Sequence, residues 1–264
     1  MDIGSLVGQE NVDLVELGAG DGHKTRILLD GLIEAGSGPR YVPVDCSASA
    51  VDKLTADAAR WFPGIATRGM ICDYAEALRW LGDRNDSGNL VVFLGSSIGN
   101  FAPGARAGFL RDVQAALGPG DLALIGFDLV KDPVRLHRAY NDEQGVTRVF
   151  NLNLLARCNR ELGADFDPEG FRFSAHWDPL EAAVHSCLVS LRSQRVRIDA
   201  LDRAFDFAPW EPLHTESSCK FTLRTIQDHA REAGFEVART FVDARRDFAD
   251  SLWRVPHDRP GPGL

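Results

Sequence analysis

The segment from Val15 to Lys24 constrains the fold of this chain more than any other feature. It reads Val-Glu-Leu-Gly-Ala-Gly-Asp-Gly-His-Lys and places glycines at alternate positions, Gly18, Gly20 and Gly22. An apolar run, 12–17, leads into it, and a helix-like run, 25–32, follows it. Glycine lets the backbone turn sharply and lets a ligand lie against the main chain. Strand, glycine turn and helix in this order are typical of the first β-α turn of a nucleotide-cofactor sheet.

The glycine spacing indicates which class of ligand this turn accepts. The pattern is Glu-x-Gly-x-Gly-x-Gly, starting at Glu16, whereas turns that bind a dinucleotide pyrophosphate read Gly-x-Gly-x-x-Gly. A carboxylate just before the turn disfavours an anionic diphosphate and favours a ligand with a cationic end. S-adenosylmethionine (SAM) carries an ammonium and a sulfonium group and fits this description. The same glycines could also serve a tight turn that binds no ligand.

Length and charge exclude several classes of protein. With 264 residues, 44% of them hydrophobic, the chain can bury a substantial core. Its formal net charge of −9 argues against extended surfaces for nucleic acid or anionic membranes. The chain has no long apolar run, and Met1–Glu10 is too short and polar for a signal peptide. We therefore expect a cytoplasmic protein with a small-molecule substrate and without nucleic-acid or membrane partners. The oligomeric state stays open.

Neither the cysteines nor the histidines show the spacing of a metal site. Five scattered cysteines, at positions 46, 72, 158, 187 and 219, include no Cys-x-x-Cys pair. Their odd number predicts buried free thiols in a reducing compartment. Four histidines also lack a common ligand spacing: His137, His176, His185 and His214. Each is expected to lie on the surface or to be satisfied in the core, so no metal is predicted.

The first half of the chain alternates between strand-like and helix-like patterns. The strand-like runs are 12–17, 40–45, 65–72, 89–94 and 121–127, and the helix-like runs are 23–35, 49–62, 75–82 and 103–117. Such alternation requires right-handed crossovers and a mostly parallel sheet covered on both faces. We predict an α/β fold with a class I, Rossmann-like sheet, in which ligands bind beyond the carboxyl ends of the strands.

After residue 128 the pattern changes. Helix-like runs at 133–140 and 146–162 are followed by alternating, strand-like runs at 171–177, 183–190 and 195–200. A possible strand (213–221), a helix (223–233) ended by Gly234 and two more strands (235–243 and 248–254) close the chain. We predict that 133–200 is an inserted α+β substrate-binding region. Residues 1–132 and 201–264 would then form the cofactor-binding domain.

Two aspartates end successive strands in this prediction. Asp45 lies 23 residues beyond Gly22, where a carboxylate can accept hydrogen bonds from ribose hydroxyls; it could instead cap the following helix. Asp73 could face the adenine amine or cap the helix that starts at Tyr74. Together with the glycines, these residues predict a SAM-dependent methyltransferase. A nicotinamide-dependent dehydrogenase is the chief competing interpretation, but the chain lacks its glycine spacing and an obvious Tyr-x-x-x-Lys pair.

The fourth strand-like run ends in Gly-Ser-Ser-Ile-Gly-Asn-Phe, residues 95–101. Its glycines, hydroxyls and Asn100 would form a polar shelf beside the reactive end of the cofactor, although a structural turn would use Gly-Asn as readily. Glu216 and Ser218 share one face of a strand, where they could bind two polar edges of one small ring. A solvated strand edge would show a similar pattern. Tyr140 decides nothing alone.

Three segments together resemble a known family. They are Glu16–Arg26, the run 95–101 with Tyr140–Asn153 downstream, and Thr-Glu-Ser-Ser-Cys-Lys-Phe at 215–221. The chain is similar, over nearly its whole length, to the histidine-specific N-alpha-methyltransferases that make trimethylhistidine (hercynine) for ergothioneine biosynthesis. The resemblance implies that free histidine binds between a SAM-binding sheet and an inserted substrate domain.

The resemblance also implies residue roles. SAM would be held by the glycine turn with Lys24, Asp45 and Asp73. Gly95, Asn100 and Tyr140 would surround the amino group and carboxylate of the substrate, and Asn100 and Tyr140 would aim the amine for catalysis. Glu216 and Ser218 would bind the imidazole.

Two departures from the family pattern keep alternatives open. Family members carry a longer amino-terminal segment that helps to close the substrate pocket, whereas the first strand here is expected near residue 12. We therefore expect a truncated chain or a shortened relative. In addition, Ser186 replaces a family methionine, so the imidazole pocket is expected to be more polar. The alternatives are another small amine, another amino acid or the imidazole nitrogen of histidine as the acceptor, and a non-catalytic relative that only binds SAM or amino acids.

Overall fold

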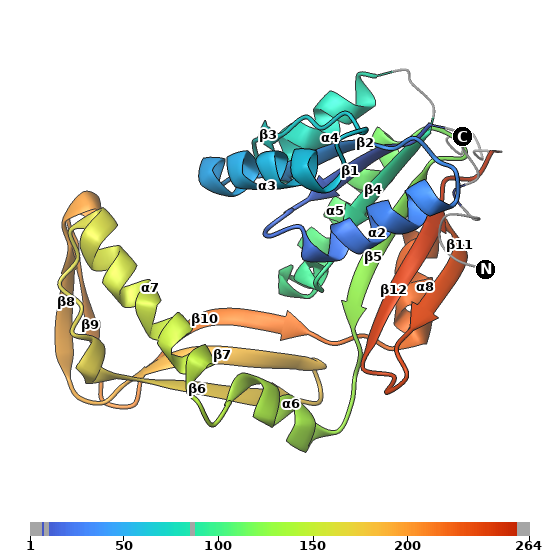
Figure 1. The fold of residues 1–264 in the computed structure, drawn as a ribbon. Coiled ribbons are helices and arrows are strands. Elements are labelled where there is room, and N and C mark those ends of the chain that lie inside the picture. Colours follow the sequence, from blue (N-terminus) through green and yellow to red (C-terminus); the bar gives the residue numbers. More distant parts are fainter. Residues whose placement is uncertain (1–6, 8–10, 85–87, 258–264) are drawn as a thin grey trace, which may run out of the picture. The chain divides into compact units, whose positions relative to one another are not determined.

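The computed structural model describes residue 7, residues 11–84 and residues 88–257, so Met1–Glu10 lies outside it apart from Val7. The chain divides into two compact units. The first comprises Met1–Leu129 and Phe221–Leu264, and the second is the intervening segment Val130–Lys220 (Figure 1). The chain therefore leaves the first unit once and returns to it once, which is the organisation of an inserted domain.

Within the described residues, seven strands form the sheet of the first unit, in the order β11-β12-β5-β4-β1-β2-β3. They are β1 (Asp13–Leu17), β2 (Arg40–Asp45), β3 (Met70–Ile71), β4 (Asn89–Phe93), β5 (Leu122–Asp128), β11 (Glu236–Val242) and β12 (Phe248–Arg254). Strands β1 to β5 are parallel, whereas β12 pairs antiparallel with β5 and with β11. The strand order reverses between β1 and β4, and ligands of open α/β sheets bind at such a reversal.

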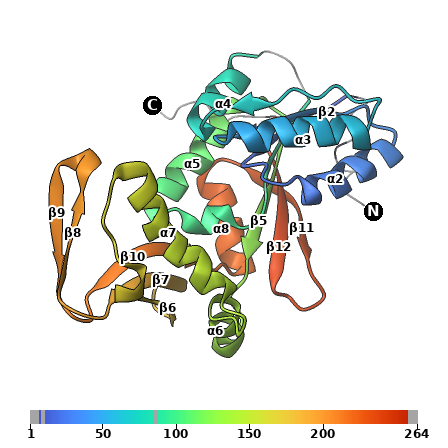
Figure 2. The ribbon, with the colours of Figure 1, turned by 60° about the vertical axis from the view of Figure 1, so that its left-hand side comes forward.

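Helices cover both faces of this sheet, as the alternation of patterns predicts. On one face, α2 (His23–Glu34) and α3 (Ala48–Trp61) pack their leucines against Leu14, Val92 and Leu124 of the strands. On the other face, α4 (Tyr74–Gly82) and α5 (Pro103–Ala116) pack aromatic rings against Phe93, and α8 (Leu223–Glu232) lies beside α5 (Figure 2). Since Val92 and Phe93 are adjacent, they point to opposite faces, and both are buried.

Strand β3 is much shorter than predicted. Only Met70 and Ile71 pair with β2, and a single bridge joins Tyr41 to Thr67. At Gly69, a Cβ would lie 2.4 Å from a methyl carbon of Val51. The backbone at Gly69 therefore packs directly against α3, and regular pairing with β2 begins only at Met70. Of the predicted strand 65–72, only Met70 and Ile71 form β3.

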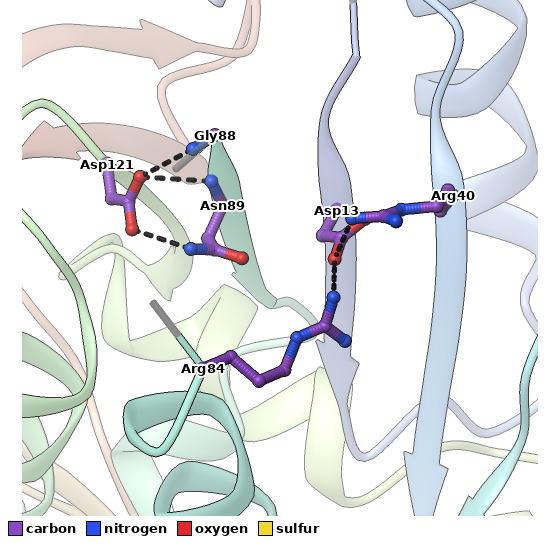
Figure 3. A network of polar contacts seen from close by, with 6 residues as sticks. All are labelled: Asp13, Arg40, Arg84, Gly88, Asn89 and Asp121. Atoms are coloured by element: carbon purple, nitrogen blue, oxygen red, sulfur yellow. Dashed lines mark hydrogen bonds and ion pairs between the residues drawn. The ribbon is translucent and has the colours of Figure 1, made fainter. Parts of the chain in front are cut away.

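Buried carboxylates tie the amino ends of the central strands together (Figure 3). Asp13, at the start of β1, accepts hydrogen bonds from Arg40 and Arg84. The Nη2 atoms of both arginines lie 2.8 Å from Asp13 Oδ2, and Arg40 Nε also donates to Asp13 Oδ1. Asp121, just before β5, accepts bonds from the backbone N–H groups of Gly88 and Asn89 at 3.1 and 3.0 Å. These contacts connect β1 with β2 and β4 with β5 at the edge opposite the glycine turn.

The second unit combines helices with two antiparallel β structures. Its elements are α6 (Pro133–Tyr140), α7 (Val146–Leu162), β6 (Phe171–Asp178), β7 (Ala183–Ser190), β8 (Gln194–Ile198), β9 (Arg203–Phe207) and β10 (Pro212–Cys219), with short 3-10 turns at Pro168–Gly170 and Asp199–Leu201. Strands β10, β7 and β6 form a sheet in that order, and β8 pairs with β9. Leu155 of α7 packs with Phe171 and Leu188 in one core, and Leu136 of α6 packs with Val184 in another.

The second unit is longer than the insertion predicted at 133–200. It begins at residue 130 and ends at residue 220, because β9 pairs with β8 and β10 pairs with β7 inside it. Strand β9 was not predicted. Its pairing partner, rather than its own sequence, makes it a strand, since Arg203 and Asp206 are exposed and only two of its residues are large and apolar.

Two further sequence predictions can be compared with the structure. The five cysteines are free thiols, but none is buried: Cys46 is exposed and the other four are partly exposed. The prediction of buried thiols was therefore wrong: Cys46 and Cys72 follow the ends of β2 and β3, Cys187 and Cys219 lie in β7 and β10, and Cys158 lies in α7 at the margin of a core cluster. Among the described residues, no helix is both long and apolar enough to cross a membrane.

Candidate active site

The glycine turn has the backbone conformation that its sequence requires. Gly18, Gly20 and Gly22 all have positive φ, at 72°, 55° and 70°. The N–H groups of Gly18 and Ala19 donate to the carbonyl of Val44 at 2.9 and 3.1 Å, so the turn is fixed to the end of β2. Side chains other than glycine adopt this left-handed conformation at a cost. The turn thus leads from β1 directly into α2, at the position where the strand order reverses.

Asp45 joins this turn to the second strand. Its Oδ2 accepts from the Gly20 N–H at 3.4 Å, and its Oδ1 accepts from the Ser47 N–H at 2.9 Å. The residue that caps α3 is Ser47, whose side chain accepts from Ala50. The alternative in which Asp45 is the helix cap is therefore wrong, and its carboxylate lies beside the glycine turn.

Asp73 is the N-cap of α4. Its Oδ1 accepts from the Glu76 N–H at 2.8 Å, which is the capping alternative, and the residue is exposed. For the next residue, Tyr74, the sequence indicated no role in the site. Its hydroxyl lies 2.9 Å from the position that a Cβ on Gly18 would take, so the ring borders the turn. Burial, followed by the nearby charge of Asp45, raises the pKa of Tyr74.

Glu16, the acidic residue of the glycine motif, faces the protein core. It is buried, and its two carboxylate oxygens are engaged by the hydroxyls of Thr25 and Tyr41. Burial raises its pKa to about 7, although both hydrogen bonds act in the opposite direction. This carboxylate therefore connects β1 to α2 and β2, and it does not supply the negative charge that the sequence suggested for a cationic ligand.

The polar shelf after β4 is built around a short 3-10 turn, η1 (Ser97–Asn100). Ser96 adopts a positive φ of 62°, and its Oγ accepts from the Asp128 N–H at 2.8 Å, which ties the shelf to the end of β5. Arg106 is buried and donates to the carbonyls of Ile98 and Phe101 at 3.3 and 3.0 Å. The turn is thus held from beneath, and Asn100 is left exposed at its end.

A second carboxylate, which the sequence did not reveal, lies close to this shelf. Asp250 Oδ1 and the backbone N of Gly95 both lie close to Gly126 of β5: a Cβ atom at Gly126 would be 3.1 Å from the first and 3.2 Å from the second. Asp250 Oδ1 is buried without a hydrogen-bond partner. Burial raises the pKa of Asp250 to about 6, and the charge of Lys24 acts in the opposite direction. Only tertiary structure brings β12 to this position, because Asp250 is far from the glycine turn in sequence.

The buried carboxyl of Asp250 leads to a prediction about pH. Between its ordinary pKa of 3.8 and its folded pKa of about 6, the folded state keeps a proton that the unfolded state has lost. Its contribution to stability therefore improves as the pH falls through this window. Asp250→Asn is expected to be more stable than the parent at pH 7.5 by about 1–3 kcal/mol, and the difference should vanish near pH 4. Urea unfolding at both pH values measures this; an equal difference at both would contradict it.

Lys24 lies near the same shelf. A Cβ at Gly95, which has a φ of 78°, would be 3.0 Å from Lys24 Nζ. The side chain is carried by the first turn of α2 and is exposed. The first unit therefore brings together the glycine turn, Lys24, Asp45 and Gly95, and adds Tyr74 and Asp250 to them.

In the second unit, a lysine joins two of the predicted substrate residues. Lys220 is buried, and its Nζ donates to the hydroxyl of Tyr140 at 2.7 Å and to Ser218 Oγ at 2.8 Å. The same ammonium lies 4.9 Å from the centre of the Tyr140 ring. Sequence reasoning did not assign Lys220 a role, although it stands inside the Thr-Glu-Ser-Ser-Cys-Lys-Phe segment. It fixes Tyr140 of α6 relative to the last strand of the unit.

Glu216 and Ser186 are opposite each other on the sheet of the second unit. They are register partners on β10 and β7, and Ser186 is almost fully buried. A register shift between His214 and Glu216 marks a β-bulge at Thr215. The Thr215 hydroxyl donates a hydrogen bond to the backbone carbonyl of Ser186 at 3.0 Å. The face that carries Ser186, Glu216 and Ser218, here called the inner face, therefore presents two hydroxyls and one carboxylate. All predicted substrate residues except Gly95 and Asn100 belong to this unit.

A family model described as histidine-specific methyltransferase, SAM-dependent, matches residues 1–255 of the chain. The chain belongs to this family. The resemblance found in the sequence is thereby confirmed, and so are a methyltransferase activity and SAM as the cofactor.

Relatives of this methyltransferase include two mycobacterial proteins named histidine N-alpha-methyltransferase. The one from Mycobacterium tuberculosis is 43% identical over 241 residues, which cover 90% of this chain and 74% of that protein. The one from Mycolicibacterium smegmatis is 42% identical, with the same two coverages. The CcbJ methyltransferase from Streptomyces caelestis superposes with a TM-score of 0.51 at 14% identity, covering 96% of this chain and 93% of that chain. At this identity the likeness shows the fold alone, and it confirms the predicted class I sheet.

The residues of the first unit fit SAM by their chemistry. Its glycines leave the backbone bare, Asp45 presents a carboxylate beside them, and Lys24 offers a cation for a carboxylate. Asp250 adds a buried oxygen without a partner, which suits an ammonium group. A ligand that carries both an ammonium and a carboxylate would satisfy the last two residues together.

Proposed function

We propose that this methyltransferase transfers methyl groups from SAM to the α-amino nitrogen of free L-histidine, up to trimethylhistidine. The observation that carries the proposal is the 43% identity to the histidine N-alpha-methyltransferase of Mycobacterium tuberculosis over 90% of the chain. Ergothioneine biosynthesis protein 1 of Neurospora crassa, 32% identical over 182 residues, supports a role of this methylation in ergothioneine biosynthesis. The net charge of −9 agrees with a small-molecule substrate rather than a nucleic acid.

The two units are proposed to divide the work. The first binds SAM through Gly18, Gly20, Gly22, Lys24, Asp45 and Asp73, to which we add Asp250 for the ammonium group. SAM supplies an electrophilic methyl group on a sulfonium. The second binds histidine through Tyr140, Ser186, Glu216 and Ser218, and Gly95 and Asn100 of the first unit complete the substrate set. Asp73 can accept from adenine only with the oxygen that does not cap α4.

Positioning is the main source of catalysis in this proposal. Methyl transfer to an amine is an in-line displacement, and good orientation supplies up to about 7–11 kcal/mol of the barrier in favourable cases. The amine attacks as a neutral group, so its proton is lost to water first. Tyr140 and Asn100 aim its lone pair. Lys220 holds the hydroxyls of Tyr140 and Ser218 at 2.7 and 2.8 Å, so little reorganisation accompanies the reaction.

Incubation with SAM and a panel of free amino acids, followed by mass spectrometry, tests the proposal. We expect histidine to gain up to three methyl groups, with all three on the α-nitrogen by NMR, and leucine to gain none. Equal activity on histidine and leucine would contradict it. SAM binding in calorimetry without any methylated product would favour a relative that binds but does not catalyse.

A second acceptor is favoured by one observation. Ser186 is buried opposite Glu216, where the family resemblance led us to expect methionine, and its hydroxyl makes that position polar. A polar pocket could turn the imidazole so that a ring nitrogen accepts the methyl group. The same NMR experiment separates the two products, since only ring methylation shifts the imidazole carbons strongly.

A further inference from the structure

The sheet of the second unit has a second polar face, opposite the inner face. His176, His185 and Ser217 are register partners across β6, β7 and β10, so they lie side by side on the same face. Their chain neighbours Ala175, Val184, Ser186 and Ser218 are buried, whereas these three are not. Because side chains alternate along a strand, the three residues point away from the predicted substrate residues. We call this the outer face.

The β-bulge adds another histidine to the outer face. Without the shift between His214 and Glu216, strict alternation would place His214 on the same face as Glu216 and Ser218. With it, His214 Nε2 lies 2.9 Å from Ser217 Oγ. The rings of His185 and His214 have centroids 6.0 Å apart, and those of His176 and His185 are 5.4 Å apart. Three imidazoles thus gather from three strands, which their spacing in sequence did not indicate.

His185, the central histidine of this group, has both ring nitrogens engaged in a directional way. Nδ1 lies 2.9 Å from Ser217 Oγ, and Nε2 lies 3.2 Å from Glu181 Oε2. In the tautomer in which Nδ1–H donates to Ser217 and Ser217 donates to His214, the lone pair of His185 is on Nε2 and is available to a metal ion on the side of Glu181. Metal-binding histidines commonly donate their other N–H to such an outer partner, which fixes the tautomer and the ring orientation.

The turn between β6 and β7 supplies two carboxylates on the same side. Asp178 Oδ1 accepts from the N–H groups of Leu180 and Glu181 at 2.7 and 3.3 Å, which orients its carboxylate. One ligand atom from each of Asp178, Glu181 and His185 lies within 4.8 Å of the other two. Glu181 is exposed, so its side chain can close the remaining distance.

We propose that Asp178, Glu181 and His185 bind one divalent transition-metal ion, with Zn²⁺ as the expected ion. A nitrogen and two carboxylate oxygens are suitable Zn²⁺ ligands at about 2.0–2.2 Å, and water takes the fourth position of a tetrahedral site. Imidazole in the set favours Zn²⁺, Ni²⁺ or Cu²⁺ over Mg²⁺ and Ca²⁺. Ser217 is a positioning residue for His185. The ion joins the β6–β7 turn to the sheet whose inner face carries Ser186, Glu216 and Ser218.

Calorimetric titration of the untagged protein with zinc chloride tests this site. Histidine and SAM are left out, because both chelate metals and would compete. We expect one Zn²⁺ per chain. Removing an outer partner of a metal ligand weakens binding by about 10–100-fold, so Ser217→Ala should fall in that range, and loss of a ligand in His185→Ala should exceed it. Glu181→Gln changes only an exposed turn residue and should weaken binding without affecting the fold.

The control is His137→Ala, which removes an exposed histidine of α6 in the same unit. It should bind Zn²⁺ as the parent does. The proposal is overturned if the parent shows no saturable binding, or if His185→Ala and Glu181→Gln bind as tightly as His137→Ala. Methylation of histidine is measured separately in each variant, so failure of the metal site does not bear on the proposed reaction, nor the reverse.

Discussion

Replacing Glu216 with alanine is expected to raise the KM for histidine by about 10–100-fold and to leave the affinity for SAM within about twofold of the parent, since loss of a hydrogen bond to a charged group costs about 1–3 kcal/mol. Glu216 is the carboxylate of the inner face, where it is paired in register with Ser186 on β7. A ring N–H of histidine donates to it in the proposed complex. SAM is proposed to bind residues of the first unit, so its affinity should not follow that of histidine.

Two variants make this prediction specific. Glu216→Gln keeps the size and one acceptor oxygen, and it should therefore lose less affinity for histidine than the alanine variant. Glu143→Ala removes an exposed carboxylate of the same unit and should change neither constant. Steady-state kinetics with each substrate varied in turn, together with calorimetry for SAM, gives the required numbers. A parallel loss of SAM affinity in Glu216→Ala would show that the residue supports the fold instead of the substrate.

Asp121→Ala is expected to lower the free energy of unfolding by about 3–5 kcal/mol, because it leaves several buried donors without partners. The two oxygens of Asp121 accept four hydrogen bonds. Oδ1 accepts from the N–H groups of Gly88 and Asn89, and Oδ2 accepts from Asn89 Nδ2 at 2.8 Å (Figure 3). Oδ2 also accepts from the Gly118 N–H at 3.0 Å. The side chain is 3% exposed, so water cannot replace these bonds.

Urea unfolding measures the loss, and two variants control it. Asp121→Asn retains one acceptor oxygen and should fall between the parent and the alanine variant. Asp112→Ala removes an exposed carboxylate of α5 and should change stability by less than about 0.5 kcal/mol. Asp121 lies at the amino ends of β4 and β5, away from the glycine turn, so SAM affinity of the folded protein should be unchanged. A loss below about 1 kcal/mol would show that the network contributes little.

Much of the first unit could be predicted because its signals are local. The predicted strands 40–45 and 89–94 agree with β2 and β4 to within one residue. Each strand has four or more consecutive buried positions, and most of these are occupied by apolar residues that can be recognised in the sequence. Gly234 was expected to end the helix at 223–233. Helix α8 ends at Glu232 with Ala233 as its C-cap, and Gly234 follows directly with a φ of 87°. The short β3 and the unpredicted β9 show the opposite case, in which pairing with a neighbour decides the strand.

The predicted site was less visible in the sequence than the predicted fold. Asp45 was expected at the end of the second strand, and it lies beside the glycine turn because the two adjacent strands of a parallel sheet have their carboxyl ends at one edge. Its role in binding SAM stays a prediction. Glu16 was misread, since its two hydroxyl partners come from α2 and β2 and draw it into the core. Tyr140, Ser186, Glu216 and Ser218 stay a prediction as histidine ligands, although their roles rest on specific motifs.

By itself, the sequence determined the order of strands and helices, the glycine turn and the family, because each of these depends on residues close together along the chain. Only the tertiary structure decided which distant side chains meet. Lys220 reaches Tyr140 across 80 positions, Asp250 comes beside Gly95 through the pairing of β12 with β5, and a bulge of one residue brings His214 to Ser217 and His185. Such contacts depend on strand register: a shift of one residue in β10 or β12 would send His214 or Asp250 to the opposite face of its sheet.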